Sequence, residues 1–497
     1  MARARASAAD STHDRAEGVL FPRGGDGRRS TAETARGVWA DAVRDLDGPL
    51  AERIEAAGDW RRQYVGAVVA HTAAATRTPT GAVAVARAGL ASLGRRMRFE
   101  RDGSSGTVAA ALSGARAGLR PRTVRGAGER ERELVLPYRG ERLRGDALRR
   151  QVDAWVDGGT VEQSCGQALH RLLDEPGWLD LSDRAFALLG AGAEMGPLEA
   201  LSRWGAHVAA VDVPSRLVWE RVFAAARAGA GTLSYPVDDD ERPGVDLLTR
   251  TPEVAAFLRA AAEGLPMTVG SYAYADGAGH VQVVHASDAV VELLLRERPD
   301  TGYAELATPT DAFAVPAEVV AESRRRWADR GWRGVLQRPA RAAGLYAPAY
   351  GTVVQREDGS TVGIADVLVP QQGPNYTLAK RVQRWRAVVA QADGHPVSAN
   401  VAPATHTRSV TRNRVLAAAY AGAGRFGVEV FASPTSRVLM AALLVHDLRA
   451  GVPAPRHPDD LFVAGAAHGG LWRVAYSPRS VLGLAAVTGL PAAFGRR

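Results

Sequence analysis

The chain has 497 residues, of which 46% are hydrophobic and 23% charged, as in ordinary globular proteins, and this length allows two or three domains. Its net charge of +8 comes from arginines spread along the whole chain among acidic residues, which argues against a dedicated nucleic-acid-binding surface. Cys165 is the only cysteine, and no apolar run reaches the ~18 residues of a membrane-spanning helix. We therefore expect a cytoplasmic protein with no nucleic-acid or membrane partner, although nucleic-acid binding through residues 107–150 stays open as an alternative.

The N-terminal third shows mainly helical patterns and no motif that can be named. Residues 1–36 contain almost no large apolar side chains, which predicts a mobile tail. Residues 37–93 carry apolar side chains at helical spacing, and two more amphipathic helices are expected around residues 148–156 and 168–173. Residues 107–133 are basic and look weakly structured. Residues 37–178 are thus predicted to form a mainly helical N-terminal region.

The pattern changes at a compact apolar strand, residues 184–189, which runs into the turn Gly190-Ala191-Gly192-Ala193-Glu194-Met195-Gly196. A helix over residues 197–204 and a second strand over residues 207–211 follow, and the strand ends at Asp212. Glycines let the backbone approach a pyrophosphate closely, and an acid about 20 residues further on can hold ribose hydroxyls. A carboxylate there repels a 2′-phosphate, so NAD is favoured over NADP, although Arg216 weakens this preference.

Further strands are expected at residues 231–235, 266–272, 303–307 and 396–401, with helices between them. This alternation predicts an α/β fold with a doubly wound parallel sheet over residues 179–497. An insertion at about residues 316–366 interrupts it and either caps a substrate or only packs. A late amphipathic helix at residues 437–448 is expected in a substrate lid or in the interface of a homo-oligomer.

Lys380 is the only lysine, although the sequence contains 62 lysines and arginines in total. A position that keeps lysine in so arginine-rich a chain is a candidate for one where a compact, tunable ammonium is needed. Lys380 lies four residues after Tyr376, so both side chains share one face of a helix. A cation beside a phenol is expected to lower the phenol pKa from its ordinary value near ~10 and to suit it for acid/base work. The alternative is a surface lysine without a role.

These features together resemble the short-chain dehydrogenase/reductase family of Rossmann-fold oxidoreductases over roughly residues 181–440. The resemblance is carried, in order, by the turn at residues 190–196, Asp212, Asp246-Leu247, Tyr376-x-x-x-Lys380, and the strand Val397-Ser398-Ala399-Asn400-Val401 with Ala402-Pro403. It implies an NAD(P)-dependent enzyme that transfers hydride between nicotinamide and an alcohol or carbonyl substrate.

The resemblance also implies roles for single residues. Tyr376 is the acid/base, and Lys380 lowers its pKa and binds the nicotinamide ribose. The cofactor is held by residues along its whole length, with the pyrophosphate at the glycines, the ribose at Asp212, the adenine at Asp246 and the nicotinamide end near the last strand: Gly190, Gly192, Gly196, Asp212, Asp246, Lys380 and Pro403.

The sequence departs from the family pattern in several places. Glu194 replaces the middle glycine, and its carboxylate is unfavourable near a pyrophosphate unless it turns away. Gly363 stands where the family serine is expected, so Thr308 or Thr310 is the candidate to replace that serine. The family also has an asparagine on a helix that helps relay protons, and His285 or a residue near it stands at that position here. These gaps leave open a second hypothesis, a dinucleotide-binding sensor or scaffold without redox chemistry. His446, His457 and His468 suit no metal-site spacing, so no metal is expected.

Overall fold

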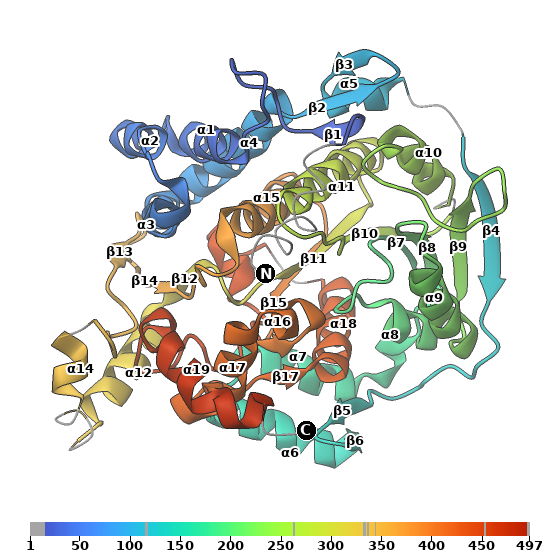
Figure 1. Cartoon of the computed structure of the whole chain (residues 1–497). Helices are drawn as coiled ribbons and strands as arrows, with labels where there is room; N and C mark the ends of the chain where they lie inside the picture. The colour runs from blue at the N-terminus through green and yellow to red at the C-terminus, as the bar shows by residue number, and fades with distance from the viewer. Residues whose placement is uncertain are drawn as a thin grey trace.

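The structure, a computed structural model, describes residues 15–114, 118–261, 264–331, 334, 337–342, 344–451 and 454–494. It is an α/β protein with a mostly parallel seven-stranded central sheet, preceded by an N-terminal helical region (Figure 1). Within these residues, no helix combines the length and apolar character that crossing a bilayer requires.

The sheet has the strand order β15-β11-β10-β7-β8-β9-β4. Its members are β4 (Arg120–Arg125), β7 (Ala185–Leu189), β8 (His207–Val211), β9 (Thr232–Val237), β10 (Met267–Ser271), β11 (Gly302–Ala307) and β15 (Val397–Val401). All neighbours pair in parallel except β4, which runs antiparallel to β9 at one edge. The chain passes from β7 to β8 on one side and later places β10 on the other, so the strand order reverses between β7 and β10.

Helices cover both faces of this sheet because successive strand side chains point to opposite faces. In β7, Ala185, Ala187 and Leu189 join one buried cluster, whereas Phe186 and Leu188 join a second. The first cluster is completed by α10 (Thr251–Ala261), α11 (Ala278–Glu297) and α15 (Gly373–Ala392). The second is completed by α8 (Leu198–Arg203), α9 (Arg216–Ala228) and α18 (Ser433–Ala450).

The N-terminal helical region is formed by α1 (Thr31–Val43), α2 (Gly48–Glu55), α3 (Trp60–Ala75) and α4 (Pro79–Arg96), as predicted. It packs on α15, where the rings of Trp39 and Trp385 lie 5.5 Å apart. The prediction of a mobile tail over residues 1–36 is wrong for the described part of that range. β1 (Gly18–Leu20) pairs with β2 (Arg98–Arg101), which pairs with β3 (Ser104–Gly106). Residues 1–14 lie outside the described residues.

The basic segment at residues 107–133 is also more ordered than predicted, since it contains α5 (Val108–Ser113) and β4. The sequence of β4, Arg-Pro-Arg-Thr-Val-Arg, is almost fully exposed and lacks an apolar alternation. Charged residues and proline are common on edge strands because they discourage further pairing. The region continues with β5 (Leu136–Tyr138), β6 (Glu141–Leu143), the two predicted helices α6 (Gly145–Asp157) and α7 (Gln163–Asp174), and η1 (Pro176–Leu179).

The insertion forms a small antiparallel sheet of order β12-β14-β13 with helices beside it. Its elements are β12 (Ala312–Pro316), α12 (Ala317–Ala328), α14 (Arg338–Ala342), β13 (Val353–Gln355) and β14 (Thr361–Asp366). The C-terminal part adds β16 (Thr405–His406), α16 (Arg408–Arg412), α17 (Arg414–Gly422), η2 (Ala423–Phe426), β17 (Phe431–Ala432), η3 (Pro458–Phe462) and α19 (Pro478–Phe494). The predicted lid or interface helix at residues 437–448 lies within α18, whose residues 438–445 are buried against the sheet, so that expectation is wrong.

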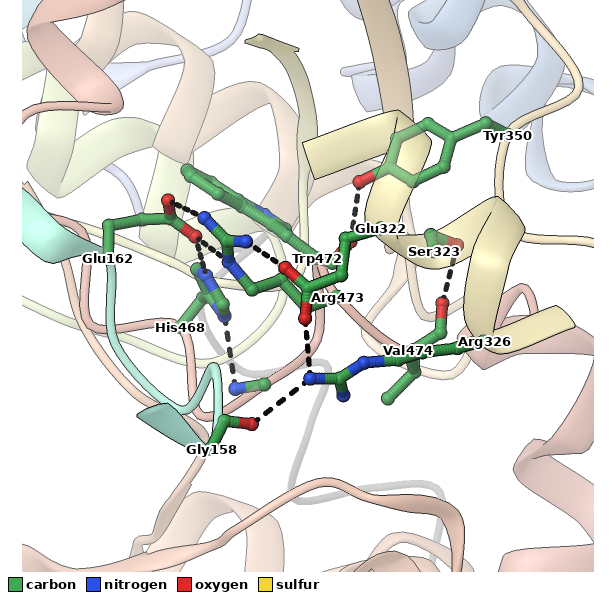
Figure 2. A network of polar contacts seen from close by, with 11 residues as sticks. Gly158, Glu162, Glu322, Ser323, Arg326, Tyr350, His468, Trp472, Arg473 and Val474 are labelled. Atoms are coloured by element: carbon green, nitrogen blue, oxygen red, sulfur yellow. Dashed lines mark hydrogen bonds and ion pairs between the residues drawn. The ribbon is translucent and has the colours of Figure 1, made fainter. Parts of the chain in front are cut away.

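A buried polar network joins three distant segments of the chain (Figure 2). The Glu162 carboxylate, which precedes α7, accepts hydrogen bonds from His468 and Arg473, and Arg473 also pairs with Glu322 of α12. Next to this network, Glu162 N–H donates to Ala466 O and Ala467 N–H donates to Val401 O, both at 2.9 Å. The network therefore holds the C-terminal segment against the end of β15.

Candidate functional site

A cleft of about 730 Å³ lies at the C-terminal ends of the parallel strands, where the strand order reverses. Ligands of open parallel sheets bind at such a point because loops on both sides diverge there. The cleft brings together the residues named above as catalytic or cofactor-binding, apart from the asparagine position: Gly190, Gly192, Gly196, Asp212, Asp246, Thr308, Thr310, Tyr376, Lys380 and Pro403. Their roles stay predictions.

The turn after β7 requires glycine at its first position. Gly190 has a φ of +87°, and a Cβ atom there would lie 2.5 Å from the backbone nitrogen of Ala273. A Cβ atom on Gly192 would lie 2.6 Å from a methyl group of Val218 and 3.2 Å from the Asp212 carboxylate. The backbone of this turn is thus pressed against its neighbours, which leaves no room for a side chain at either glycine.

Asp212, at the end of β8, is tied to the same turn. One carboxylate oxygen accepts the Gly192 N–H at 2.7 Å, and the other accepts the Val213 N–H at 2.8 Å. Burial raises the pKa of Asp212, and these two hydrogen bonds partly offset the increase. Arg216, which was expected to weaken the preference for NAD, pairs with Glu220, is largely exposed and does not line the cleft.

Asp246, which follows β9 and also lines the cleft, accepts the Leu248 N–H at 3.0 Å and pairs with Arg15. Arg15 also lines the cleft, and its contact with Asp246 spans 231 residues of sequence. Sequence reasoning missed Arg15 because no local pattern connects the two residues.

Glu194, the acidic residue in the glycine turn, is held by groups from the C-terminal part of the chain. Its carboxylate accepts the Arg408 N–H and the Ser433 hydroxyl, each at 2.9 Å. These hydrogen bonds partly replace the water that would solvate the carboxylate, and they hold it against Arg408 and Ser433.

Tyr376 lies in the first turn of α15, which begins at Gly373 and has Pro374 near its start, where a missing N–H costs nothing. Its hydroxyl donates to the Thr308 hydroxyl at 3.0 Å, and the hydroxyl oxygens of Thr308 and Thr310 lie 2.9 Å apart. The threonine pair follows β11, 68 residues before the tyrosine. The threonine pair therefore lies beside Tyr376 in the cleft, whereas Gly363 lies in β14, outside the cleft.

The expectation that the Tyr376 phenol has a lowered pKa is wrong for this structure. Burial raises the pKa of Tyr376, because the phenolate would lose its solvation. Hydrogen bonds with Thr308 and Thr310 oppose this increase, and the acidic residues Asp311 and Glu305 add to it. The phenol is thus protonated near neutral pH.

The ammonium group of Lys380 is held by two hydrogen-bond acceptors. Its ammonium donates to the Leu306 carbonyl at 3.1 Å and to Gln383 Oε1 at 2.7 Å. Gln383 in turn donates to the carbonyl and hydroxyl of Ser271, at 3.0 and 3.2 Å. Among the described residues this leaves the third donor of the ammonium for a ligand in the cleft. Burial lowers the pKa of Lys380, although Glu305 and Asp311 act in the opposite direction.

Two buried arginines fix α15 relative to the threonine loop. Arg381 and Arg384 pair with the two carboxylate oxygens of Asp311 at 2.9 and 2.8 Å. Burial alone would raise the pKa of Asp311, but the two arginines outweigh it and hold the pKa below its ordinary value. The loop that carries Thr308 and the helix that carries Tyr376 are therefore locked together by charge.

Some residues of the cleft were missed or misplaced by the sequence. The His280 ring, from the first turn of α11, lies 5.5 Å from the Tyr376 ring and 4.8 Å from that of Tyr274. Burial lowers the pKa of His280 to about 3, so the imidazole is neutral. The position proposed for the family asparagine, His285, is buried elsewhere and does not line the cleft. The sequence pattern predicts the start of this helix at about His285, but α11 begins at Ala278, so His280 in its first turn was overlooked.

The insertion does not contribute to the cleft, since none of its described residues lines it, and so it does not cap the site. Among the described residues, no three His, Cys, Asp or Glu side chains gather closely enough to hold a metal ion. A comparison with protein-family models and with curated proteins finds no match for this sequence.

Proposed function

We propose that the chain is an NAD-dependent oxidoreductase of the short-chain dehydrogenase/reductase type that transfers hydride between nicotinamide and an alcohol or carbonyl substrate. One observation carries this proposal: the Tyr376 hydroxyl bonds to Thr308, and Lys380 lies one helical turn further on, in the same cleft as the glycine turn. This arrangement supplies an acid/base, a second hydroxyl for the substrate oxygen, and a cation.

The sheet supports the finer assignment of the fold. The six parallel strands follow the order β9-β8-β7-β10-β11-β15, which is the 3-2-1-4-5-6 order of the doubly wound Rossmann fold. In that fold a dinucleotide lies across the point of reversal, and its pyrophosphate is near the first glycine-rich turn. Gly190 and Gly192 occupy that turn here.

The residues of the cleft fit a nicotinamide dinucleotide. Gly190 and Gly192 line the cleft, and their backbone, without side chains, can approach a pyrophosphate closely. The Asp212 carboxylate retains acceptor capacity for ribose hydroxyls, and its charge disfavours the 2′-phosphate of NADP. Asp246 and Arg15 would hold the adenine end, and Lys380 the nicotinamide ribose. Nicotinamide, when bound, supplies the hydride donor or acceptor.

Tyr376 would exchange a proton with the substrate oxygen, and Thr308 and Thr310 would hold that oxygen next to the phenol. The raised pKa of Tyr376 keeps the phenol protonated near neutral pH, which suits the donation of a proton to a carbonyl oxygen. We therefore propose carbonyl reduction as the favoured direction. Lys380 would stabilise the phenolate that forms as the proton leaves.

The test compares the wild-type chain with Tyr376→Phe on a panel of alcohols and carbonyl compounds, with NADH absorbance as the readout. We expect Tyr376→Phe to bind NADH as the wild type does and to lose turnover by roughly 10²–10⁴-fold. Tyr235→Phe, on β9 and outside the cleft, is the matched control and keeps full turnover. Undiminished turnover in Tyr376→Phe rules the mechanism out.

The missing family serine and asparagine also favour a second candidate, a dinucleotide-binding sensor or scaffold without redox chemistry. In that case NADH binds to the cleft with measurable affinity, but no carbonyl compound of the panel changes its absorbance. Binding without turnover therefore distinguishes the two candidates.

A further inference from the structure

Glu305 is a buried carboxyl in the middle of β11 that the proposed mechanism does not use. Its residue is 2% exposed, and both carboxyl oxygens lack a hydrogen-bond partner among the described residues. A buried, unpartnered carboxyl group costs free energy, because the groups that solvate it in water are not replaced. Such a residue in an otherwise apolar strand calls for a functional explanation.

The residues next to Glu305, along its own strand and on the neighbouring strand, hold the proposed acid/base pair. The next residue, Leu306, gives its carbonyl to the Lys380 ammonium, and Thr308 binds Tyr376. On the neighbouring strand Ser271 is the register partner of Glu305, and its side chain and carbonyl bind Gln383, which binds Lys380. Glu305 is therefore surrounded by the groups that hold Lys380.

The charged groups around Glu305 come from several elements. Lys380 and Arg384 of α15 attract it, and Asp311 of the loop after β11 repels it. From α11, His280 and His285 are neutral, because burial lowers their pKa values to about 3 and 4. Asp288 of the same helix is neutralised by Arg386, and the phenols of Tyr272 and Tyr303 are protonated, because burial raises their pKa values.

Burial raises the pKa of Glu305 to about 7, and Lys380 and Arg384 hold it below the value that burial alone would give. In return, the Glu305 carboxylate raises the pKa of both Lys380 and Tyr376. The carboxyl thus changes its charge close to neutral pH, and the charge acts on both residues of the proposed acid/base pair.

We propose that Glu305 is a positioning residue that sets the net charge Lys380 presents to Tyr376. This inference rests on the proposed function. When Glu305 is protonated, the ammonium charge is unopposed and favours the phenolate. When Glu305 is ionised, it offsets that charge, and the phenol keeps its proton for delivery to a carbonyl oxygen. The buried carboxyl would thus favour proton donation above neutral pH, where a lone ammonium would favour proton loss.

The first test is the pH profile of kcat/KM for carbonyl reduction in Glu305→Gln, which keeps the shape of the side chain and removes its charge. We expect the limb that reports the loss of the Tyr376 proton to move to lower pH by on the order of one unit. Glu305→Asp, which keeps the charge, retains a profile near that of the wild type. Glu292→Gln, a half-exposed carboxyl on α11, is the matched control and leaves the limb in place. An unmoved limb in Glu305→Gln overturns the inference.

A second measurement does not depend on turnover. The infrared band of the protonated Glu305 carboxyl, identified as the band that Glu305→Gln lacks, is titrated in the wild type and in Lys380→Gln. We expect its midpoint near pH 7 in the wild type and a higher midpoint in Lys380→Gln, because the attracting cation is gone. An identical midpoint in both overturns the inference. A shifted midpoint without turnover on any substrate overturns the proposed function but supports the coupling of the two charges.

Discussion

The network around Glu162 yields a stability prediction whose size follows from the structure (Figure 2). The residue is 6% exposed, and its carboxylate accepts hydrogen bonds from His468 at 2.8 Å and from Arg473 at 2.8 and 2.6 Å. Glu162→Gln removes the charge that these donors require. We expect the variant to be less stable than the wild type at neutral pH, because among the described residues the largely buried Arg473 then keeps Glu322 as its one charged partner.

The size of the effect follows from the pKa of Glu162. Burial alone would raise it, but His468 and Arg473 outweigh burial and lower it from 4.5 to about 2. At about 1.4 kcal/mol per pH unit, this change corresponds to roughly 3 kcal/mol of stability. Because the folded-state pKa is the lower one, this stability is fully present above the unfolded value of 4.5 and is lost as the pH falls toward 2.

Urea unfolding at about pH 7 and about pH 3 measures the free energy of unfolding of both proteins. We expect Glu162→Gln to be about 3 kcal/mol less stable at the higher pH, with a smaller difference at the lower pH. Asp174→Asn, which breaks an exposed pair with Arg149 on neighbouring helices, is the control and costs less than about 1 kcal/mol. A difference between wild type and Glu162→Gln that stays the same at both pH values refutes the reasoning.

Three further predictions concern the cleft. Gly190→Ala places a side chain on a residue with left-handed backbone and against Ala273, so we expect stability to fall by at least ~2 kcal/mol and NADH binding to weaken. Thermal unfolding and fluorescence titration measure these two effects, and Gly177→Ala, where a Cβ atom meets nothing, is the control. Asp212→Asn removes the charge that disfavours a 2′-phosphate, so the ratio of NADP to NAD affinity should rise by about tenfold, as calorimetric titrations of both cofactors will show. Lys380→Arg replaces a buried ammonium by a larger planar group, so turnover should fall by roughly 10²-fold in steady-state assays.

The parts of the fold that follow from local patterns could be predicted from the sequence. The apolar run of β7, the glycine turn after it and β8 follow from their own sequence signals, namely apolar side chains for burial on both faces and glycines that mark the turn. β4 could not be predicted in this way, because an exposed edge strand is held by backbone pairing with β9 and needs no apolar alternation. The strand β1 likewise depends on β2, which lies far from it in the sequence.

The candidate site shows the same division. The spacing of Tyr376 and Lys380 on one helix and the position of Thr308 after a strand are readable locally. The pKa of Tyr376 is not, because its direction depends on burial and on acidic residues that the fold brings in from β11 and the following loop. Glu305 did leave a signal, as the one charged residue of an apolar strand, and that signal is typical of a buried functional group.

The central claim is that this cleft holds a nicotinamide dinucleotide, with its pyrophosphate at the glycine turn. Titration of the chain with NADH, followed by the fluorescence of the nicotinamide, tests it directly. The account predicts saturable binding to the wild type that Gly192→Val weakens by at least about tenfold, because the new side chain would meet Val218 and fill the turn, while thermal unfolding shows the variant to be folded. Absence of saturable binding to the wild type, or equal binding to a folded Gly192→Val variant, would contradict it.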